Sequence, residues 1–342
     1  MRTIVTIIVL IVFNTFSFGQ KEKVTVDFNK NIEFLGYIID LVDPADNDVN
    51  HPIRKIIHQY PEDLKQPDLG EILQIAANID YSTLIHLMYF LPEFPLDNNY
   101  EVPNSLKTLL GYTSKQDGKT LDLLVHKTNS FYKVSKFEQV WNHLSAERKK
   151  VTQFIRDNKP KEEVFHYMEA FYGKEFRKYH IIPSLTIWTA GFGVNDSEKN
   201  MANFVLGPLR KNYEFDHKQD FLNLTIHEFG HSFVNSVVAA NSSTINESEK
   251  LFIPLKESMT RQGYSNWLTC LIEHFVRAGE VIVNEQLGNK KASEDLLKEY
   301  SEDRDFQYLS FIVEQLKKYR IQENYSYSDA VQKVIEDLKS FL

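Results

Sequence analysis

The residues with the clearest capacity for chemistry are His227, Glu228 and His231, which fall within the sequence HEFGH. Histidines four residues apart lie on one face of a helix, about one turn from each other, so both imidazoles could bind the same metal ion. Glu228 lies one step around that helix, where its carboxylate could reach a water molecule on the metal. The spacing therefore predicts a metal site that activates water, with Glu228 as the general base.

A helix has to hold these three side chains in place, and the sequence around them predicts one. Residues 221–240 are largely apolar and follow the helical period. Asp216 can cap this helix, with Gln219 in the capping-box position. The core positions recur at steps of four and three and are Leu222, Ile226, Phe229, Phe233 and Val237. The two histidines lie beside this stripe, so they should face the edge of the core, where a cleft could open.

A catalytic zinc site needs a third protein ligand and leaves one position for water. Glycine three residues and histidine six residues after the second histidine would indicate a metzincin, but Val234 and Val237 occupy those positions. An aspartate ligand is excluded as well, because no aspartate lies between His231 and Asp295. The remaining donors are His274 and the glutamates Glu247, Glu249, Glu257, Glu273, Glu280 and Glu285.

Glu273 is the preferred third ligand because of its surroundings. Residues 254–287 are predicted to form one long helix, ended by Gly288, whose apolar surface is wide enough for the helix to be largely buried. A polar line that contains Glu273 and Arg277 runs through this surface. It could face solvent, but a buried carboxylate requires a cation, and zinc bound to Glu273, with Arg277 beside it, would supply one. Glu257 is the alternative ligand, although the helix dipole favours an acid near the helix start in any case.

Hydrolysis at such a site would also need a donor that stabilises the developing oxyanion. Tyr264 and His274 are candidates because they lie near Glu273 in the sequence. On an unbroken helix, however, Tyr264 would point away from Glu273. The sequence therefore assigns neither residue to the site.

A small sheet is expected next to the histidine-bearing helix. Residues 23–28 alternate like a short strand, and residues 179–188 and 203–206 are rich in β-branched and aromatic side chains. Gly191-Phe192-Gly193 lies between the last two segments and is interpreted as part of the loop that joins them. Since helical patterns dominate elsewhere, we expect an α+β fold that is predominantly helical, with the sheet beside the HEFGH helix.

The chain is expected to divide into two regions at Lys159-Pro160. The first, residues 20–159, is expected to be mostly helical. Within it, residues 135–157 are predicted to form one uninterrupted helix, and residues 97–120 are rich in turns. The second, residues 160–342, carries the candidate metal ligands and would be the catalytic region. The two regions could also form one compact unit.

Residues 1–19 carry the features of a secretory signal peptide. Arg2 supplies a short positive region, residues 4–13 are apolar apart from one threonine, and small residues precede a cleavage point before Gln20. The apolar run is shorter than the roughly 18 residues that a membrane span needs, and no cysteine follows it for a lipid anchor. We therefore expect a secreted or periplasmic protein without stable membrane insertion.

Charge and cysteine content narrow the possible partners. The formal net charge is −8, so removal of Arg2 with residues 1–19 gives −9. An acidic exported chain is a poor match for nucleic acid or for an anionic membrane. Cys270 is the single cysteine, so no disulfide can form within the chain. We expect a monomer with a peptide or protein as its substrate.

The sequences HEFGHSF, QGYSNW and IEHFVRA together resemble the gluzincin branch of the zincin metallopeptidases. More narrowly, the chain is similar to a domain family of unknown function that is common in secreted proteins of Bacteroidetes. The resemblance is firmest over residues 221–278. It implies a zincin-like core in which His227, His231 and Glu273 bind Zn²⁺. It also implies that Glu228 is the catalytic base.

The same resemblance implies a sheet beside the active helix whose edge strand holds an extended peptide, and residues 181–206 would supply that edge. In the best-known gluzincins the third ligand lies closer to the second histidine, a distance that Glu257 matches better than Glu273. Both glutamates therefore remain candidates for the third position.

These features together predict a secreted zinc metallopeptidase that hydrolyses peptide bonds. Zinc lowers the pKa of a bound water to about 7, and Glu228 would take its proton and pass it to the leaving amine. The alternative from another class is a secreted binding or structural protein with a vestigial site, against which the intact Glu228 argues. A third possibility is a zinc enzyme that acts on a different amide, such as one in cell-wall peptide.

Overall fold

The computed structural model shows a chain that is mostly helical. The described residues are 22–42, 52–187, 191–209, 215 and 218–342. Helices make up 68% of the structure and the strands form one small mixed sheet, which confirms the predicted α+β, predominantly helical class. None of the described helices combines the length and the apolar character that a membrane span requires. The predicted signal peptide and the predicted cap Asp216 lie outside the described residues.

The sheet has its strands in the order β1, β2, β4, β3, so β3 lies at an edge. Their bounds are β1 (Val24–Val26), β2 (Lys178–Pro183), β3 (Gly191–Asp196) and β4 (Met201–Leu206). β1 and β4 run parallel to β2, whereas β3 pairs antiparallel with β4. The loop predicted through Gly191-Phe192-Gly193 is therefore wrong. Main-chain pairing with β4 outweighs the low strand propensity of the two glycines.

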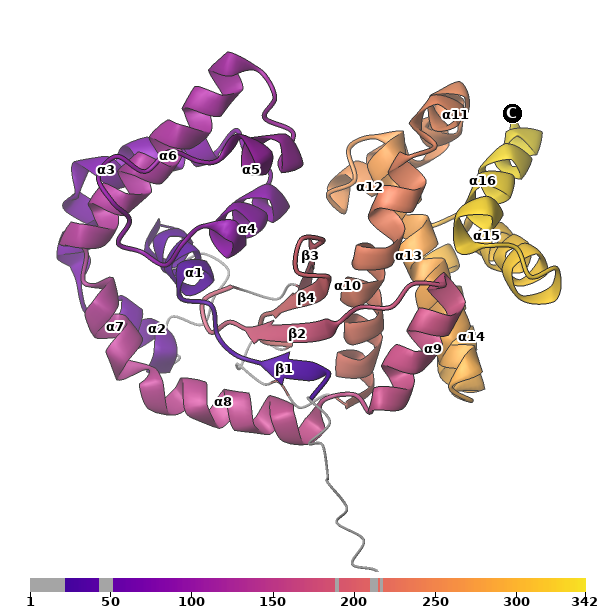
Figure 1. Ribbon diagram of the computed structural model, residues 1–342, viewed down its shortest axis with the longest axis horizontal. Helices are drawn as coiled ribbons and strands as arrows, with labels where there is room; N and C mark the ends of the chain where they lie inside the picture. Colours follow the sequence, from indigo (N-terminus) through magenta and orange to yellow (C-terminus); the bar gives the residue numbers. More distant parts are fainter. Residues whose placement is uncertain (1–21, 43–51, 188–190, 210–214, 216–217) are drawn as a thin grey trace, which may run out of the picture.

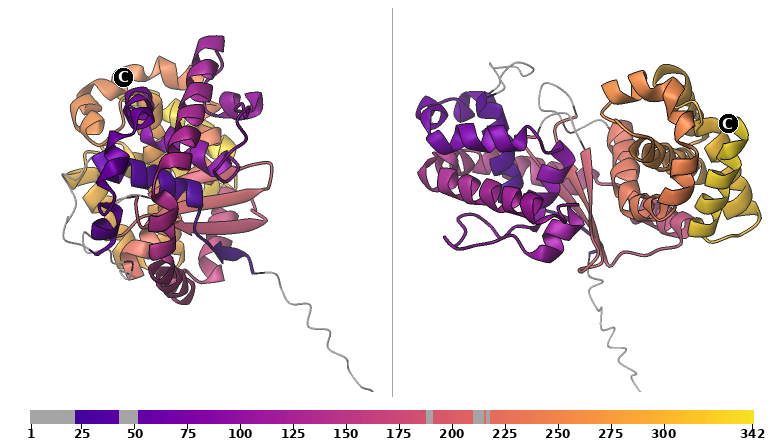
Figure 2. Two further views of the ribbon diagram at one scale, coloured as in Figure 1. Left: turned by 90° about the vertical axis from the view of Figure 1, so that its left-hand side faces the viewer. Right: turned by 90° about the horizontal axis from the view of Figure 1, so that it is seen from above.

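The sheet lies between two layers of helices, as the right-hand view of Figure 2 shows. We call the helices that precede residue 159 the N-terminal layer. They are α1 (Lys30–Val42), α2 (Pro52–Ile57), α3 (Pro67–Ala76), α4 (Tyr81–Phe90), α5 (Asn104–Leu109), α6 (Lys115–Val134), α7 (Phe137–His143) and α8 (Ser145–Asn158).

The helices after residue 160 form the C-terminal layer on the other face of the sheet. They include α9 (Glu162–Tyr172), α10 (Lys218–Ala239), α11 (Ser242–Glu247), α12 (Lys256–Arg261), α13 (Trp267–Gln286), α14 (Lys290–Lys298), α15 (Leu309–Leu316) and α16 (Tyr327–Leu338). α10 carries the HEFGH sequence and packs against β3 and β4, and α13 packs along α10 (Figure 1).

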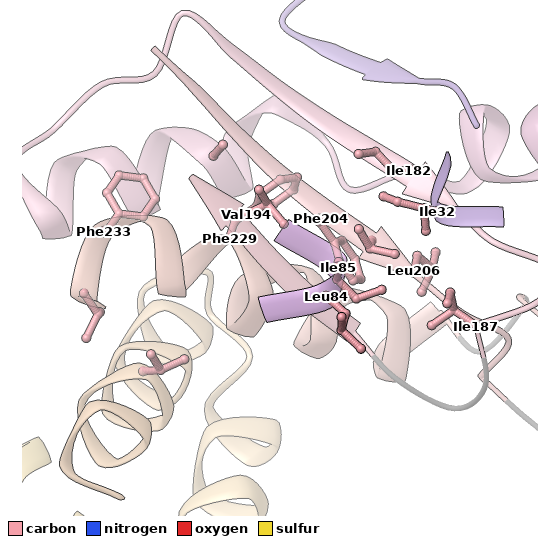
Figure 3. Packing of buried hydrophobic residues seen from close by; sticks show 14 of the residues in the cluster. Ile32, Leu84, Ile85, Ile182, Ile187, Val194, Phe204, Leu206, Phe229 and Phe233 are labelled. Atoms are coloured by element: carbon pink, nitrogen blue, oxygen red, sulfur yellow. The ribbon is translucent and has the colours of Figure 1, made fainter. Parts of the chain in front are cut away.

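Successive side chains of β3 and β4 point alternately toward the two helix layers, so each layer packs against a different set of strand side chains. Phe204 faces α10, where its ring centroid lies 5.7 Å from that of Phe229, within the apolar cluster of Figure 3. Its neighbour Asn203 faces the N-terminal layer and accepts a hydrogen bond from the Tyr89 hydroxyl of α4 (3.0 Å). Gly193 is paired with Phe204 and so lies on the α10 face of the sheet.

The single helix predicted over residues 135–157 is wrong, because the chain divides at Leu144 into α7 and α8. The Arg148 side chain of α8 donates a hydrogen bond to the carbonyl oxygen of Trp141 in α7. Its guanidinium carbon also lies 3.3 Å from the centroid of the Trp141 ring. Residues 97–120, expected to be turns, contain α5 and the start of α6. Local periodicity does not report the contacts between helices that decide these boundaries.

The long helix predicted over residues 254–287 is also wrong, and this difference matters for the site. Gly263 has a φ of +97°, a backbone conformation that favours glycine, and it interrupts the helix between α12 and α13. Asn266 then caps α13 by accepting from the Thr269 N–H (2.9 Å). The chain turns in the intervening loop, residues 263–266, instead of continuing along one axis.

Candidate metal centre

Three of the predicted site residues come together where α13 packs against α10. His227 and His231 project from α10 and Glu273 from α13, and one donor atom of each lies within 4.8 Å of the others. His227 Nε2 is 3.6 Å from Glu273 Oε2, and His231 Nε2 is 3.3 Å from Glu273 Oε1. Glu257 is not part of this group, since its side chain is 88% exposed and pairs with Arg261. The geometry therefore favours Glu273 over Glu257 as the third ligand.

The three donors fit a tetrahedral metal ion. Ligand atoms about 2.1 Å from zinc lie about 3.4 Å from one another at tetrahedral angles. The two histidine–carboxylate separations, 3.6 Å to Oε2 and 3.3 Å to Oε1 of Glu273, are close to this value, and the three donor atoms all lie within 4.8 Å of one another. Glu273 Oε2 is buried and has no hydrogen-bond partner among the described residues, although a buried carboxylate oxygen normally has one. A cation between the three side chains would give this oxygen its partner.

Each histidine is oriented by a contact on its other ring nitrogen. His227 Nδ1 donates to Glu280 Oε2 (3.3 Å), and His231 Nδ1 donates to Asn235 Oδ1 (3.0 Å). An amide oxygen accepts only, and so does the Glu280 carboxylate when it is ionised. In that state the ring proton lies on Nδ1, and Nε2 keeps its lone pair for a metal. Burial holds the pKa of His227 well below its usual range, which favours the same neutral ring.

Glu280 is a site residue to which the sequence pattern assigned no role. It is buried, and its carboxylate also accepts the Tyr300 hydroxyl (3.0 Å). Burial raises the pKa of Glu280 to about 7, against the attraction of Arg277. Glu280 lies seven residues after Glu273, so both carboxylates are on one face of α13. That spacing is the sequence signal that could have identified it.

Arg277 lies next to Glu273, as the sequence pattern predicts. Its Nη2 is 3.6 Å from Glu273 Oε2, and its guanidinium is 4.4 and 4.5 Å from the ring centroids of Tyr300 and Phe306. Burial acts to raise the pKa of Glu273, but the two imidazoles and this guanidinium outweigh it, so the pKa is lowered. Glu273 is therefore held as a carboxylate.

Glu228 lies beside the metal ligands, buried between α10 and the edge strand β3. A Cβ added at Gly191 would lie 2.4 Å from Glu228 Oε1, and one added at Gly193 would lie 2.2 Å from the Glu228 carbonyl oxygen. The strand can approach the helix this closely only because both residues are glycine. Burial raises the pKa of Glu228 to about 7, although His231 acts to lower it. Such a pKa suits a group that accepts and returns a proton near neutral pH.

A cleft of about 560 Å³ opens over these residues. Its walls come from β3, α10, the 263–266 loop and α13, and also from α4 of the N-terminal layer. A larger hollow of about 690 Å³ lies between α3 and α6 and is lined by none of the metal ligands. The chemistry of the side chains, and not the size of the hollow, therefore identifies the site.

Tyr264 lines this cleft, because the break at Gly263 lets the chain turn toward the metal ligands. Its hydroxyl oxygen accepts a hydrogen bond from Arg277 Nη2 (3.3 Å). His274 is buried elsewhere, and its Nδ1 donates to the Cys270 carbonyl oxygen (2.8 Å). Of the two candidates for oxyanion stabilisation, the structure brings only Tyr264 into the cleft.

A family model described as a domain of unknown function (DUF4932) matches residues 107–331. The match covers more than half of the chain and includes α10 and α13 with all the candidate metal ligands. No curated protein and no solved structure matches the chain.

We predict that the purified chain binds one zinc ion and that Glu273 is required for it. Glu273→Ala should lower zinc affinity by roughly 100-fold or more, because it removes one of three protein ligands. Glu257→Ala is the matched control and should leave the affinity unchanged. Zinc content after dialysis and competition with a chelator measure both variants. Loss of zinc from the Glu257 variant would reverse the assignment, and absence of zinc from the unaltered chain would favour a binding or structural protein.

We also predict that Glu280 positions His227 for the metal. Glu280→Ala should lower zinc affinity by about 10- to 100-fold without loss of fold, since the partner of His227 Nδ1 is removed. Glu280→Gln should recover much of this affinity, because an amide oxygen can still accept from Nδ1. Glu285→Ala, on the exposed side of α13, is the control. An unchanged zinc affinity in a folded Glu280→Ala chain would show that His227 needs no such partner.

Proposed function

The chain belongs to the DUF4932 family, and we propose that it is a secreted zinc-dependent metallopeptidase of the gluzincin type. The observation that carries this proposal is the convergence of two histidines and a buried carboxylate oxygen that has no hydrogen-bond partner among the described residues, beside Glu228. Three protein ligands leave a fourth position open, as in catalytic zinc sites, whereas structural sites use four.

The residues of the chain would handle the proton in peptide hydrolysis. A zinc ion supplies Lewis acidity, which lowers the pKa of water to about 7 and polarises a carbonyl group. Glu228 accepts the proton of the attacking water as the C–O bond forms, and returns it to the amine nitrogen as the C–N bond breaks. Its place against β3 shields the carboxylate from bulk water, and its raised pKa suits both transfers.

Tyr264 is the group best placed to stabilise the developing oxyanion. A guanidinium only donates, so the Tyr264 oxygen is the acceptor in its contact with Arg277. The Tyr264 hydroxyl therefore directs its proton away from Arg277. It helps to lower the pKa of Glu273 by donating to that carboxylate, and the same proton could be donated to an oxyanion in the cleft. Burial raises the pKa of Tyr264 to about 12, so the hydroxyl stays protonated at neutral pH.

The edge strand β3 offers a place for the main chain of the substrate. No described strand pairs with its outer edge, and the strand passes Glu228 at the close approach of Gly191 and Gly193. An extended peptide could add to this edge through main-chain hydrogen bonds, which would carry a peptide bond past the base. This arrangement supports a polypeptide substrate over a small amide.

We predict that Glu228→Gln keeps zinc and loses hydrolysis. Glutamine has the same shape but cannot accept the proton, so kcat should fall by about 10²- to 10⁴-fold. A digest of a broad peptide library by the zinc-loaded chain, read by mass spectrometry, first supplies a cleaved peptide for this measurement. Glu285→Gln, the same change at an exposed position, should preserve both properties.

Either of two results would contradict these roles. Full hydrolysis by Glu228→Gln would remove Glu228 as the general base. A zinc-loaded, unaltered chain that cleaves no peptide in the library would contradict the proposed function itself.

Tyr264→Phe should lower kcat by about 100-fold, because one donor to the oxyanion is lost. KM and zinc content should stay the same, since the phenyl ring fills the same space. Tyr325→Phe, the same change at an exposed position, is the control and should leave kcat unchanged. If kcat is equal in the two variants, another group stabilises the oxyanion.

A further inference from the structure

One wall of the cleft is not accounted for by the metal ligands or the base. Asp80, Ser82 and His86 line it, and they belong to α4 and its N-cap. Figure 1 shows α4 and α12 on opposite sides of β3. The N-terminal layer therefore borders a site whose candidate metal ligands all belong to the C-terminal layer.

Contacts at both ends of α4 fix this helix against the sheet. At its start, the Tyr81 ring meets Phe192 of β3 edge to face, with centroids 5.2 Å apart. At its end, the Tyr89 hydroxyl donates to Asn203 Oδ1 of β4 (3.0 Å). His86 lies between these two contacts, so packed side chains set its position relative to the edge strand.

The hydrogen bonding of His86 leaves one ring nitrogen for a ligand. Its Nδ1 donates to the Ser82 carbonyl oxygen (2.7 Å), and since a carbonyl only accepts, Nδ1 carries the ring proton. Nε2 of the neutral ring is then an acceptor. Burial lowers the pKa of His86, although the Ser82 carbonyl acts to raise it, and this favours the neutral ring. Within the described part of the chain, no group donates to Nε2.

A main-chain N–H of a bound peptide is the ligand that this acceptor fits. A peptide added to β3 directs alternate N–H groups toward that strand and the others away from it. The N–H groups that face away leave water when the peptide enters the cleft, so they need acceptors. Asp80 is already engaged, because its carboxylate accepts the N–H groups of Ser82 and Thr83 (3.2 and 3.0 Å). Two side-chain acceptors of this wall receive no hydrogen bond from a described residue: Ser82 Oγ and His86 Nε2. The Ser82 hydroxyl can also donate, whereas His86 Nε2 in this tautomer only accepts.

We propose that His86 is a substrate-binding residue whose Nε2 accepts a hydrogen bond from one main-chain N–H of the peptide. This inference rests on the proposed function and adds a selectivity to it. Proline has no N–H, so the enzyme discriminates against proline, and equally against an N-methylated residue, at that one position of the substrate. The N-terminal layer thereby takes part in substrate recognition.

A double-mutant cycle tests this inference with binding, and not turnover, as the readout. The zinc-loaded Glu228→Gln chain is titrated with a peptide that the unaltered chain cleaves, and with a series in which each main-chain nitrogen in turn is methylated. The same series is then titrated against the chain that also carries His86→Ala. At one position methylation should weaken binding by about 3- to 10-fold, the size of one neutral hydrogen bond. His86→Ala should abolish the penalty at that position alone.

The controls separate this inference from the proposed function. His126→Ala, at an exposed position of α6, should leave every penalty unchanged. If His86→Ala lowers the melting temperature or the zinc content, His86→Phe is used in its place. Its ring fills the same space but has no hydrogen-bond acceptor. Identical penalties with and without His86 would overturn the inference while the proposed function stands. If the unaltered, zinc-loaded chain cleaves no library peptide, the proposed function fails and the inference fails with it.

Discussion

An excess of negative charge buried between α10 and α13 is the constraint on which the rest of the structure depends. The charged side chains buried on the described parts of these helices are the carboxylates of Glu228, Glu273 and Glu280 and the guanidinium of Arg277. Three negative charges against one positive charge leave two in excess, and burial of unpaired charge costs several kcal/mol per ion. Burial raises the pKa of Glu228 and Glu280 to about 7, so both are partly protonated near neutral pH and the excess is smaller than two. The Glu273 oxygen that has no hydrogen-bond partner among the described residues marks the point where a bound cation would balance the negative charge that remains.

Glycines set the distances on both sides of α10. On the sheet side, Gly191 and Gly193 let β3 reach the backbone and the carboxylate of Glu228. On the other side, the Tyr172 hydroxyl of α9 enters between α10 and α13, where a Cβ at Gly279 would lie 2.0 Å from it and one at Gly230 3.4 Å. A side chain at Gly191, Gly193 or Gly279 would have to displace a packed neighbour, whereas a Cβ at Gly230 would only reach van der Waals contact. The separation of α10 from both β3 and α13 is therefore fixed by residues without side chains, and this separation holds the ligand set together.

Site residues that lie on one helix could be predicted from the sequence. Site residues whose place depends on how elements pack together, or on where the backbone turns, could not. Two histidines at a four-residue spacing stay adjacent wherever their helix packs. Glu280 was within reach of the same reasoning, but its role depends on which face of α13 meets α10. Tyr264 was considered as an oxyanion donor but not assigned, because the helical period continues through Gly263, whose φ in fact breaks the helix. β3 has glycines where a strand pattern needs β-branched residues, and only pairing with β4 makes it a strand. His86 has no local signal, since contacts remote in sequence bring α4 to the cleft.

On the proposed function, the groups that would bind the metal and those that would recognise the substrate lie on different parts of the fold, and this separation limits what the proposed enzyme can cleave. The candidate ligands lie on one helix pair in the C-terminal layer, whereas the cleft is bordered by both layers and by the sheet between them. A substrate strand on the edge of β3 would lie between α4 on one side and the 263–266 loop on the other. A space of about 560 Å³ enclosed in this way admits an extended segment but not a folded domain. On the proposed function, a protein substrate must therefore offer an unfolded or exposed stretch of chain, because its main chain has to replace its own hydrogen bonds with those of β3.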